Sequence, residues 1–321
     1  MPGKESKKMV ETGQFRIGVD LGGTKTEAVA IGADGEIAAR QRVDSPRDDY
    51  QATVKNLTDL VKSVENEINA RGSVGVAIPG AISPATGLVK NANSTWLIGH
   101  ELDTDLSAVL ERPVRLANDA NCFALSEAVD GAAAGASVVF GVIVGTGTGG
   151  GLAINGRVIG GANAIAGEWG HNPLPWPEGD EWPGTTCYCG KTSCIETFIS
   201  GTGLARDHLA VTGQNLSAED IAANTLAGDP LAEASFQRYE RRMAKALASV
   251  VNVLDPDVIV LGGGVSNVER IYRNVPPLIG KFTFSDEVKP NLRRNVHGDS
   301  SGVRGAAWLW HDDEMSMALS N

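Results

Sequence analysis

Apolar and polar positions follow two spacings along the chain, and these predict strands and helices in turn. Period-two or continuous runs of apolar β-branched residues predict strands, whereas three- and four-residue spacing predicts helices. In the N-terminal part we expect two strands within 15–31, a strand over 36–43, a helix over 50–70, strands over 74–78 and 114–117, and a helix over 120–130. A loop rich in Pro and Gly is expected over 79–84. This alternation is typical of a layered α/β protein.

The C-terminal part repeats the alternation. We expect two strands within 139–154, a long loop over 172–186, three helices of which the last covers 231–254, a strand over 258–261, a helix from Asn267 and a helix over 303–310. Apolar residues of the helix over 231–254 recur at helical spacing: Phe236, Tyr239, Met243, Leu247, Val250 and Leu254. Such a stripe packs on a hydrophobic core and is not a cofactor site.

Two segments, roughly 125 residues apart, share one design. Each has an apolar strand, a glycine-rich turn containing Gly-Thr and a second apolar strand, at 15–31 and 139–154. Glycine allows backbone N–H groups to approach phosphate oxygens closely, so the pair predicts a nucleotide held between two lobes. Each turn taken alone also fits a purely structural hairpin. The second hairpin begins soon after residue 120, and we expect the boundary between the lobes there.

Two familiar phosphate motifs do not fit these turns. A Walker A loop requires Gly-Lys followed by Ser or Thr and then a helix, whereas 18–25 ends in Gly-Thr-Lys before a strand. The run 145–150 matches the dinucleotide fingerprint, but a strand-like pattern follows it where that motif opens a helix. Both assignments are therefore excluded.

Two aspartates, Asp20 and Asp119, each follow the end of a predicted strand, where open α/β sheets present chemistry. Phosphoryl transfer to an alcohol needs a carboxylate that accepts the hydroxyl proton and a metal ion that neutralises the phosphates. Asp119, with Asn118, fits the first role, and Asp20 fits the binding of Mg²⁺ through water. Asp119 also precedes a predicted helix, so an N-cap is the alternative explanation.

Three cysteines, Cys187, Cys189 and Cys194, lie within eight residues, and Cys122 is far from them. Clustered thiols in an intracellular chain more often bind a metal than form disulfides. His171 is the nearest candidate to complete a four-ligand zinc site. No open position is indicated, so we expect the zinc to be structural and to keep the flanking Glu168 and Glu196 near one point.

The composition narrows the function classes. The chain has 39 Asp and Glu against 28 Lys and Arg, and its formal charge of -11 disfavours nucleic-acid binding. No apolar run approaches the length of a membrane span. The first fourteen residues are polar and lack the apolar core of a secretory signal, so we expect a disordered extension over 1–14. The expected protein is soluble and cytoplasmic.

The chain resembles the ROK family of sugar kinases and repressors. Its supporting motifs lie at 20–25 (DLGGTK), 117–121 (ANDAN), 145–147 (GTG), 167–171 (GEWGH) and 187–196 (CYCGKTSCIE). Within the family it looks most like the bacterial fructokinases also described as mannokinases, through 89–96, 170–176 and 297–308. Where the family usually has glycine before its last cysteine, this chain has Ser193.

The resemblance implies an actin-like (ribonuclease H-like) fold of two lobes and a homodimer. We expect a small lobe over 15–120, joined by a C-terminal helix at about 303–316, and a large lobe over 121–302 with a zinc loop over 171–194. Carried over by position, Asp119 is the catalytic base. The sugar hydroxyls would be bound by Asn118, Glu168, His171 and Glu196, and His171 would also bind zinc through its other ring nitrogen.

The same resemblance implies a set of residues for ATP with Mg²⁺. The set comprises Gly18, Asp20, Gly22, Gly23, Thr24 and Lys25 in the first turn, Gly145, Thr146, Gly147, Thr148 and Gly149 in the second, and Gly262, Gly263 and Gly264 near the adenosine.

The expected reaction is phosphorylation of a hexose 6-hydroxyl by ATP, with fructose as the first candidate substrate. Mannose, glucose and N-acetylglucosamine suit the same residue types, and a sugar-sensing module without catalysis is the second function class. A repressor is excluded because the DNA-binding helix-turn-helix of ROK repressors needs far more residues ahead of the first strand.

Overall fold

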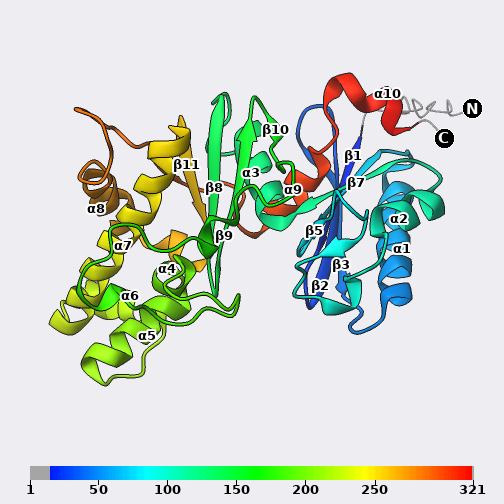
Figure 1. Ribbon diagram of the computed structural model, residues 1–321. Coiled ribbons are helices and arrows are strands. Elements are labelled where there is room, and N and C mark those ends of the chain that lie inside the picture. Colours follow the sequence, from blue (N-terminus) through cyan, green and yellow to red (C-terminus); the bar gives the residue numbers. More distant parts are fainter. Residues whose placement is uncertain (1–14, 320–321) are drawn as a thin grey trace, which may run out of the picture. The chain divides into compact units, whose positions relative to one another are not determined.

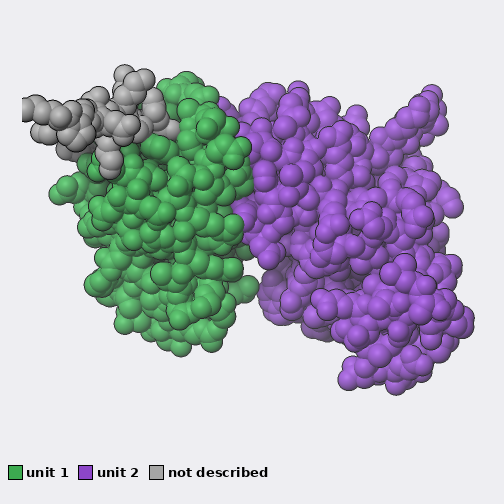
Figure 2. Space-filling model, turned by 180° about the vertical axis from the view of Figure 1, so that it is seen from behind, with its two compact units in different colours: residues 1–122, 302–321 green, residues 123–301 purple. Residues whose placement is uncertain are grey.

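The computed structural model describes residues 15–319 and divides into two compact units, shown in different colours in Figure 2. Unit 1 comprises the described residues up to Cys122 and from Gly302 onwards, and unit 2 comprises Phe123–Ser301. The chain therefore leaves unit 1 once and returns to it once. The extension predicted over 1–14 lies outside the described residues.

Unit 1 is built on a five-stranded sheet with the order β3-β2-β1-β4-β7. Its elements are β1 (Arg16–Leu21), β2 (Lys25–Ile31), β3 (Ile37–Asp44), α1 (Tyr50–Ile68), β4 (Ser73–Ile78), β5 (Ala81–Ile82), β6 (Val89–Lys90), α2 (Leu102–Leu110), β7 (Val114–Asn118), α9 (Ser301–Ala307) and α10 (Met315–Ala318). β1, β2 and β3 pair antiparallel, whereas β1, β4 and β7 are parallel. β5 and β6 form a separate two-stranded sheet.

Helices cover both faces of this sheet (Figure 1). α1 and α2 pack their apolar residues on one face, together with Ile17 and Val19 of β1. On the other face, Val303 and Ala307 of α9 pack against Val29 and Ile31 of β2. The unit is thus a three-layer α/β structure with the sheet in the middle layer. Successive side chains along each strand point to opposite faces of the sheet and so pack on different helices.

Two paired glycines bring α9 close to the sheet. Gly18 of β1 and Gly75 of β4 are direct neighbours in the register. A Cβ on Gly18 would collide with the carbonyl oxygen of Val303, and one on Gly75 with that of Ala306. Close packing of a helix on a strand therefore explains why these positions are glycine.

Unit 2 repeats the strand order of unit 1, as β10-β9-β8-β11-β12. Its elements are α3 (Asp119–Val129, which begins in unit 1), β8 (Val138–Val144), β9 (Thr148–Ile154), β10 (Arg157–Val158), α4 (Glu196–Ile199), α5 (Gly201–Thr212), α6 (Ala218–Leu226), α7 (Pro230–Leu254), β11 (Val258–Gly262), α8 (Arg270–Ile279) and β12 (Leu292–Arg294). Antiparallel and parallel pairs also recur in the same places. This duplication confirms the predicted actin-like fold.

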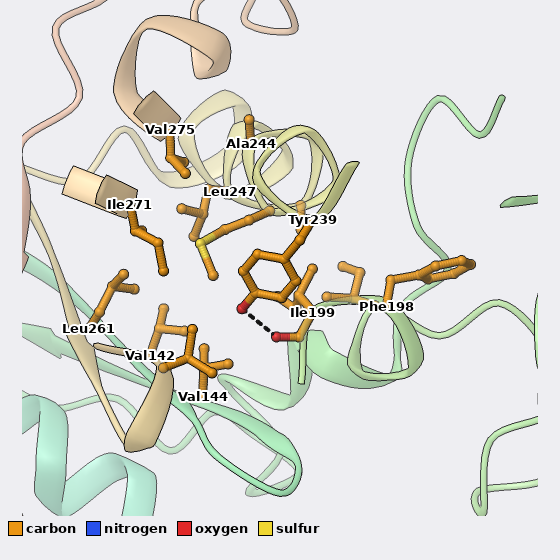
Figure 3. Close-up of a cluster of buried hydrophobic side chains, with 14 of the residues drawn as sticks. Val142, Val144, Phe198, Ile199, Tyr239, Ala244, Leu247, Leu261, Ile271 and Val275 are labelled. Atoms are coloured by element: carbon orange, nitrogen blue, oxygen red, sulfur yellow. Dashed lines mark hydrogen bonds between the residues drawn. The ribbon is translucent and has the colours of Figure 1, made fainter. Parts of the chain in front are cut away.

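The main core of unit 2 lies between its sheet and α7. Val142 and Val144 of β8 pack against Tyr239 and Leu247 of α7, which belong to the predicted apolar stripe (Figure 3). The Tyr239 hydroxyl donates a hydrogen bond of 2.7 Å to the carbonyl oxygen of Ile199, drawn as a dashed line in Figure 3. The prediction that this stripe is core is confirmed.

The sequence pattern did not indicate that charged residues of α7 are also buried. Lys245 is fully buried and its Nζ lies 2.6 Å from Glu181 Oε2, while Arg242 contacts Glu181 and Asp207. A buried charge is tolerated when it is paired and hydrogen-bonded, as here. The loop that contains Glu181 is therefore fixed to the second face of α7.

Several element boundaries differ from those predicted. α2 was not expected, because only Leu102, Leu106 and Leu110 mark its buried side within a polar stretch. The predicted loop over 79–84 contains β5. Four α-helices, not three, lie between the loop over 172–186 and β11: α4, α5, α6 and α7.

The helix predicted over 303–310 and extended to about 316 is wrong in its length. α9 ends at Ala307, and the carbonyl oxygen of Trp310 accepts a hydrogen bond from Arg16 Nε. The Trp310 indole N–H donates in turn to the carbonyl oxygen of Val74. These contacts with the sheet take the place of a longer helix.

Candidate functional site

The predicted base, Asp119, follows the end of β7 and is the first residue of α3. Asn118 lies just before it, and its side-chain oxygen accepts a hydrogen bond of 2.9 Å from the Ala120 N–H. This is the contact that an N-cap residue makes with the second helical residue. Asn118 therefore performs the capping role that was the alternative explanation for Asp119, although Asp119 Oδ1 also accepts from Ala120 N. Asn118 Nδ2 donates to the carbonyl oxygen of Gly80.

Asp20 lies near the end of β1, and its electrostatic surroundings include Asp119 and Glu27. Burial, the Asp119 carboxylate and Glu27 together raise the pKa of Asp20 from 3.8 to about 7, against an opposing effect of Arg42. Gly302 is close as well, since a Cβ there would lie 2.8 Å from Asp20 Oδ2. Two neighbouring carboxylates with little compensating charge fit the binding of a hard divalent cation.

The first hairpin tip connects β1 to β2 through Gly22, Gly23 and Thr24. Ser45, at the end of β3, binds this tip twice: its hydroxyl donates 2.7 Å to Gly22 O and its N–H donates 3.0 Å to Thr24 O. Lys25, also predicted for ATP, forms an ion pair with Asp44 that lowers the pKa of the Asp44 carboxyl. Gly23 has open space around its Cβ position.

The second hairpin tip connects β8 to β9 through Gly145, Thr146 and Gly147, and Thr148 begins β9. Gly145 N donates to Gly147 O across the turn. Within the described part of the chain, the N–H groups of Thr146 and Gly147 have no hydrogen-bond acceptor. These two amides are therefore the ones in the tip that remain for a phosphate.

A cavity of about 560 Å³ adjoins this tip within unit 2. It is lined by Gly145 and Thr146, by Gly264, and by apolar side chains such as Leu204 and Val265. An apolar cavity beside free backbone amides fits a nucleoside with its phosphates at the hairpin.

Two of the glycines predicted for ATP have packing reasons to be glycine. Gly18 lies beneath α9, as described above, and Gly262 lies beneath the Phe123 ring, which a Cβ would approach to 2.5 Å. Gly263 has a positive φ of 80° and lies against the carbonyl of Val144. The assignment of Gly18 and Gly262 to ATP thus rests on the family resemblance alone.

The structure brings Glu168, His171 and Glu196 into one region of unit 2. Glu168 and His171 lie on a short 3₁₀ helix, Glu168–His171, and Glu196 is the first residue of α4. This 3₁₀ helix packs on β9, where the Trp169 indole N–H donates 3.2 Å to Gly149 O. Gly170 has no room for a Cβ because the Thr148 carbonyl lies against it.

The predicted zinc ligands also come together. One donor atom from each of His171, Cys187, Cys189 and Cys194 lies within 4.8 Å of the others. Cys189 Sγ and Cys194 Sγ are 3.6 Å apart, and Cys187 Sγ is 3.7 Å from His171 Nδ1. Tetrahedral zinc with thiolate and imidazole ligands requires edges of about 3.5–3.8 Å. The donor set and its spacing fit zinc.

Ser193, which stands at the usual glycine position, has a φ of 61°. This left-handed conformation is the reason that glycine is favoured there. The Ser193 hydroxyl accepts a hydrogen bond of 2.8 Å from Gly184 N, and the Ser193 N–H donates to Thr185 O. These two contacts stabilise the turn with serine in place.

Tyr188 is the residue that the motifs did not indicate. Its hydroxyl lies 3.0 Å from His171 Nε2, the nitrogen that does not face the cysteines. Desolvation, Glu196 and Glu168 are among the causes that raise the pKa of Tyr188 to about 12. The phenol is therefore close to all three residues predicted to bind sugar in this unit. A tyrosine between two cysteines of a motif does not, from the sequence alone, indicate a contact with a distant histidine.

Comparison with known proteins places the chain in a family. The profile of the ROK family matches residues 16–313. The chain belongs to the ROK family. An N-acetyl-D-glucosamine kinase of Yersinia enterocolitica is 39% identical over 296 residues, covering 91% of this chain and 98% of that protein. The N-acetyl-D-glucosamine kinase of Photobacterium profundum is 40% identical over the same length and covers 91% and 98%.

Solved structures of ROK proteins share the architecture. The ROK hexokinase of Thermus thermophilus superposes with a TM-score of 0.81 at 31% identity, covering 92% of this chain and 97% of that one. A ROK glucokinase of Streptomyces griseus, solved with glucose and AMPPNP, has a TM-score of 0.71 at 25% identity, with 91% and 98% covered. Among the helices of the described residues, none is long and apolar enough to cross a membrane.

Proposed function

We propose that this ROK protein is a kinase that transfers the γ-phosphoryl group of ATP to the 6-hydroxyl of a hexose. The observation that supports it most is the Asp119 carboxylate, which follows a strand end beside Asp20 while Asn118 caps the helix. Asp119 takes the hydroxyl proton as the oxygen attacks the phosphorus. Asp20 would bind Mg²⁺ through water, and the ion would neutralise phosphate charge.

The family resemblance supports Glu168, His171 and Glu196 as the residues that would bind hexose hydroxyls, with Asn118 as a fourth. Carboxylates accept hydrogen bonds from hydroxyls, and the Asn118 amide keeps one N–H and one lone pair beyond its contacts with Ala120 and Gly80. Zinc at the cysteine cluster would be structural, because the four donor atoms would fill all four tetrahedral positions. ATP would occupy the cavity beside Gly145 and Gly264, with phosphate at the amides of Thr146 and Gly147, and the family resemblance supports 22–25 of the first tip as further ATP-binding residues.

Two hexoses lead the list of substrates. The motifs at 89–96, 170–176 and 297–308 favour D-fructose, giving D-fructose 6-phosphate. The names of two relatives at 39% and 40% identity favour N-acetyl-D-glucosamine. Turnover per Michaelis constant should be measured with both sugars and with mannose and glucose, and the highest kcat/KM identifies the substrate. The resemblance also supports a homodimer in the cytoplasm, and sedimentation velocity would test the dimer.

Asp119→Asn tests the catalytic role. We expect kcat to fall by a factor of about 10² to 10⁴, with hexose affinity changed little, because the amide cannot accept the proton. Asp59→Asn, an exposed aspartate of α1, is the matched control and should keep full activity. A sugar sensor would instead bind a hexose without turnover in the wild-type protein. Near-normal turnover of Asp119→Asn would show that Asp119 is not the base.

A further inference from the structure

The Glu196 carboxylate contacts the second hairpin tip directly. Its Oε2 accepts a hydrogen bond of 2.9 Å from the backbone N–H of Thr148. Its Oε1 lies 3.9 Å from Cys187 Sγ and is the oxygen left for a sugar hydroxyl. One side chain of the sugar-binding set therefore fixes the position of an amide at the start of β9.

Gly147 leaves room for this contact. A Cβ at Gly147 would lie 2.7 Å from Glu196 Oε2 and 3.5 Å from the carboxyl carbon. The φ of Gly147 is not in the left-handed region that favours glycine. The steric requirement at this position is therefore set by the Glu196 carboxylate, not by the geometry of the turn.

The residues that follow Glu196 bind the rest of the tip. Gly201 N donates 2.8 Å to Gly145 O, and Thr202 Oγ1 donates 2.8 Å to Thr146 O. Together with the Glu196 bond, these contacts fix the tip on both sides of its two free amides, those of Thr146 and Gly147. Movement of the segment 196–202 would move the amides that are available to a phosphate.

We propose that the contacts of Glu196, Gly201 and Thr202 with the second hairpin couple hexose binding to nucleotide binding. The inference rests on the proposed function. A hexose that fixes Glu196 also fixes Thr148 N–H and, through it, the free amides of the tip. Because coupling between two equilibria is reciprocal, bound nucleotide tightens hexose binding by the same factor.

The experiment compares two alanine variants of the same tip. Gly147→Ala inserts a methyl group against Glu196, whereas Gly145→Ala places one in open space. Calorimetry with D-fructose and with N-acetyl-D-glucosamine, without nucleotide, gives the hexose Kd. We expect Gly147→Ala to raise that Kd tenfold or more, and Gly145→Ala to leave it within about twofold.

The coupling itself is measured with a non-hydrolysable ATP analogue. In the wild-type protein we expect saturating hexose to lower the Kd of the analogue by about 5- to 50-fold. Thr202→Val, which loses one contact with the tip while its side chain stays at the surface, should reduce this factor at least threefold and keep the hexose Kd. Circular dichroism and zinc content confirm that each variant is folded.

The possible failures are distinct. If no hexose of the panel binds the wild-type protein, the proposed function is wrong. If a hexose binds and folded Gly147→Ala matches the wild type, or if the hexose leaves the Kd of the analogue unchanged, the coupling is wrong and the kinase proposal stands. Should Gly147→Ala not fold, an unchanged coupling factor in Thr202→Val overturns the inference alone.

Discussion

The two glycine hairpins share a sequence design but differ in what supports their tips. The first tip is bound by Ser45, which lies at the end of β3 in the same sheet. The second is bound by Glu196, the first residue of α4, and by Thr202 of α5. A Gly-Thr turn between apolar strands thus specifies a hairpin. The residues that bind the tip determine which other part of the protein fixes its position.

Below their tips the hairpins share one packing feature. In unit 1, Gly18 of β1 lies beneath α9, and in unit 2, Gly141 of β8 lies beneath α3, where a Cβ would approach Ala124 to 2.8 Å. Each sheet therefore has a glycine in the first strand of its hairpin that admits a helix. The hairpins differ in what binds their tips and in the residue two positions after this glycine, which is Asp20 in β1 and Ile143 in β8.

The largest effect is expected at the base of the first hairpin. Gly18→Ala places a Cβ against the Val303 carbonyl. A backbone carbonyl cannot move aside by a change of rotamer, as a side chain could. We expect a loss of about 3 to 5 kcal/mol in the free energy of unfolding, measured in urea. Gly23→Ala, with open space at the tip, should change it by less than about 0.5 kcal/mol. Equal effects in the two variants would contradict this account of the glycines.

The next largest effect is expected from loss of zinc. It concerns Glu196, which binds the second hairpin tip, and not the residues that bind the first. Cys194→Ser is expected to abolish the zinc content, to lower Tm and to weaken hexose binding at least tenfold, because Glu196 follows the last ligand closely. Elemental analysis, with Cys122→Ser as the control cysteine outside the cluster, is the first measurement. Wild-type protein that holds no zinc when purified without added metal would show that the cluster is not a zinc site.

Asp20 in the first hairpin corresponds in position to Ile143 in the second, and only Asp20 can ionise. The pH dependence of stability therefore tests a difference between the two hairpins. Because the folded-state pKa of Asp20 is raised from 3.8 to about 7, its favourable contribution is present in full below pH 4 and is lost as the pH rises through 7. Without Mg²⁺, the stability of the wild type relative to Asp20→Asn should fall by about 2 to 3 kcal/mol between pH 5 and pH 8. A pH-independent difference between the two proteins would exclude this titration.

The smallest effect compares two buried threonines. Thr26 Oγ1 is hydrogen-bonded to Ser45 Oγ at 2.8 Å, whereas Thr148 Oγ1 is buried without a hydrogen-bond partner in the described residues. Thr26→Val should cost about 1 kcal/mol, and Thr148→Val should gain up to about 1 kcal/mol. Urea unfolding of both variants checks the opposite signs. If Thr148→Val also destabilises, its hydroxyl has a partner in solution.

Local patterns predicted most of the scaffold and the cluster of His171, Cys187, Cys189 and Cys194. The ligands at 187–194 are close in sequence, and the two hairpins repeat a recognisable spacing, so both are local signals. The contact between Glu196 and Thr148 joins residues that are far apart in the chain, and no pattern in either segment indicates the other. The capping by Asn118 was missed because Asn and Asp are both good N-caps and stand side by side.

Both connections between the units run through helices. The boundary at residues 122 and 123 falls within α3, and that at 301 and 302 falls at the start of α9. A Cβ on Gly305 would overlap the carbonyl of Cys122, so the two helices touch backbone to backbone. Proteases cleave extended, exposed chain, and hydrogen-bonded helix resists them. Limited proteolysis is therefore not expected to release the isolated units. To study one unit by itself, a gene that encodes only that unit has to be designed and expressed.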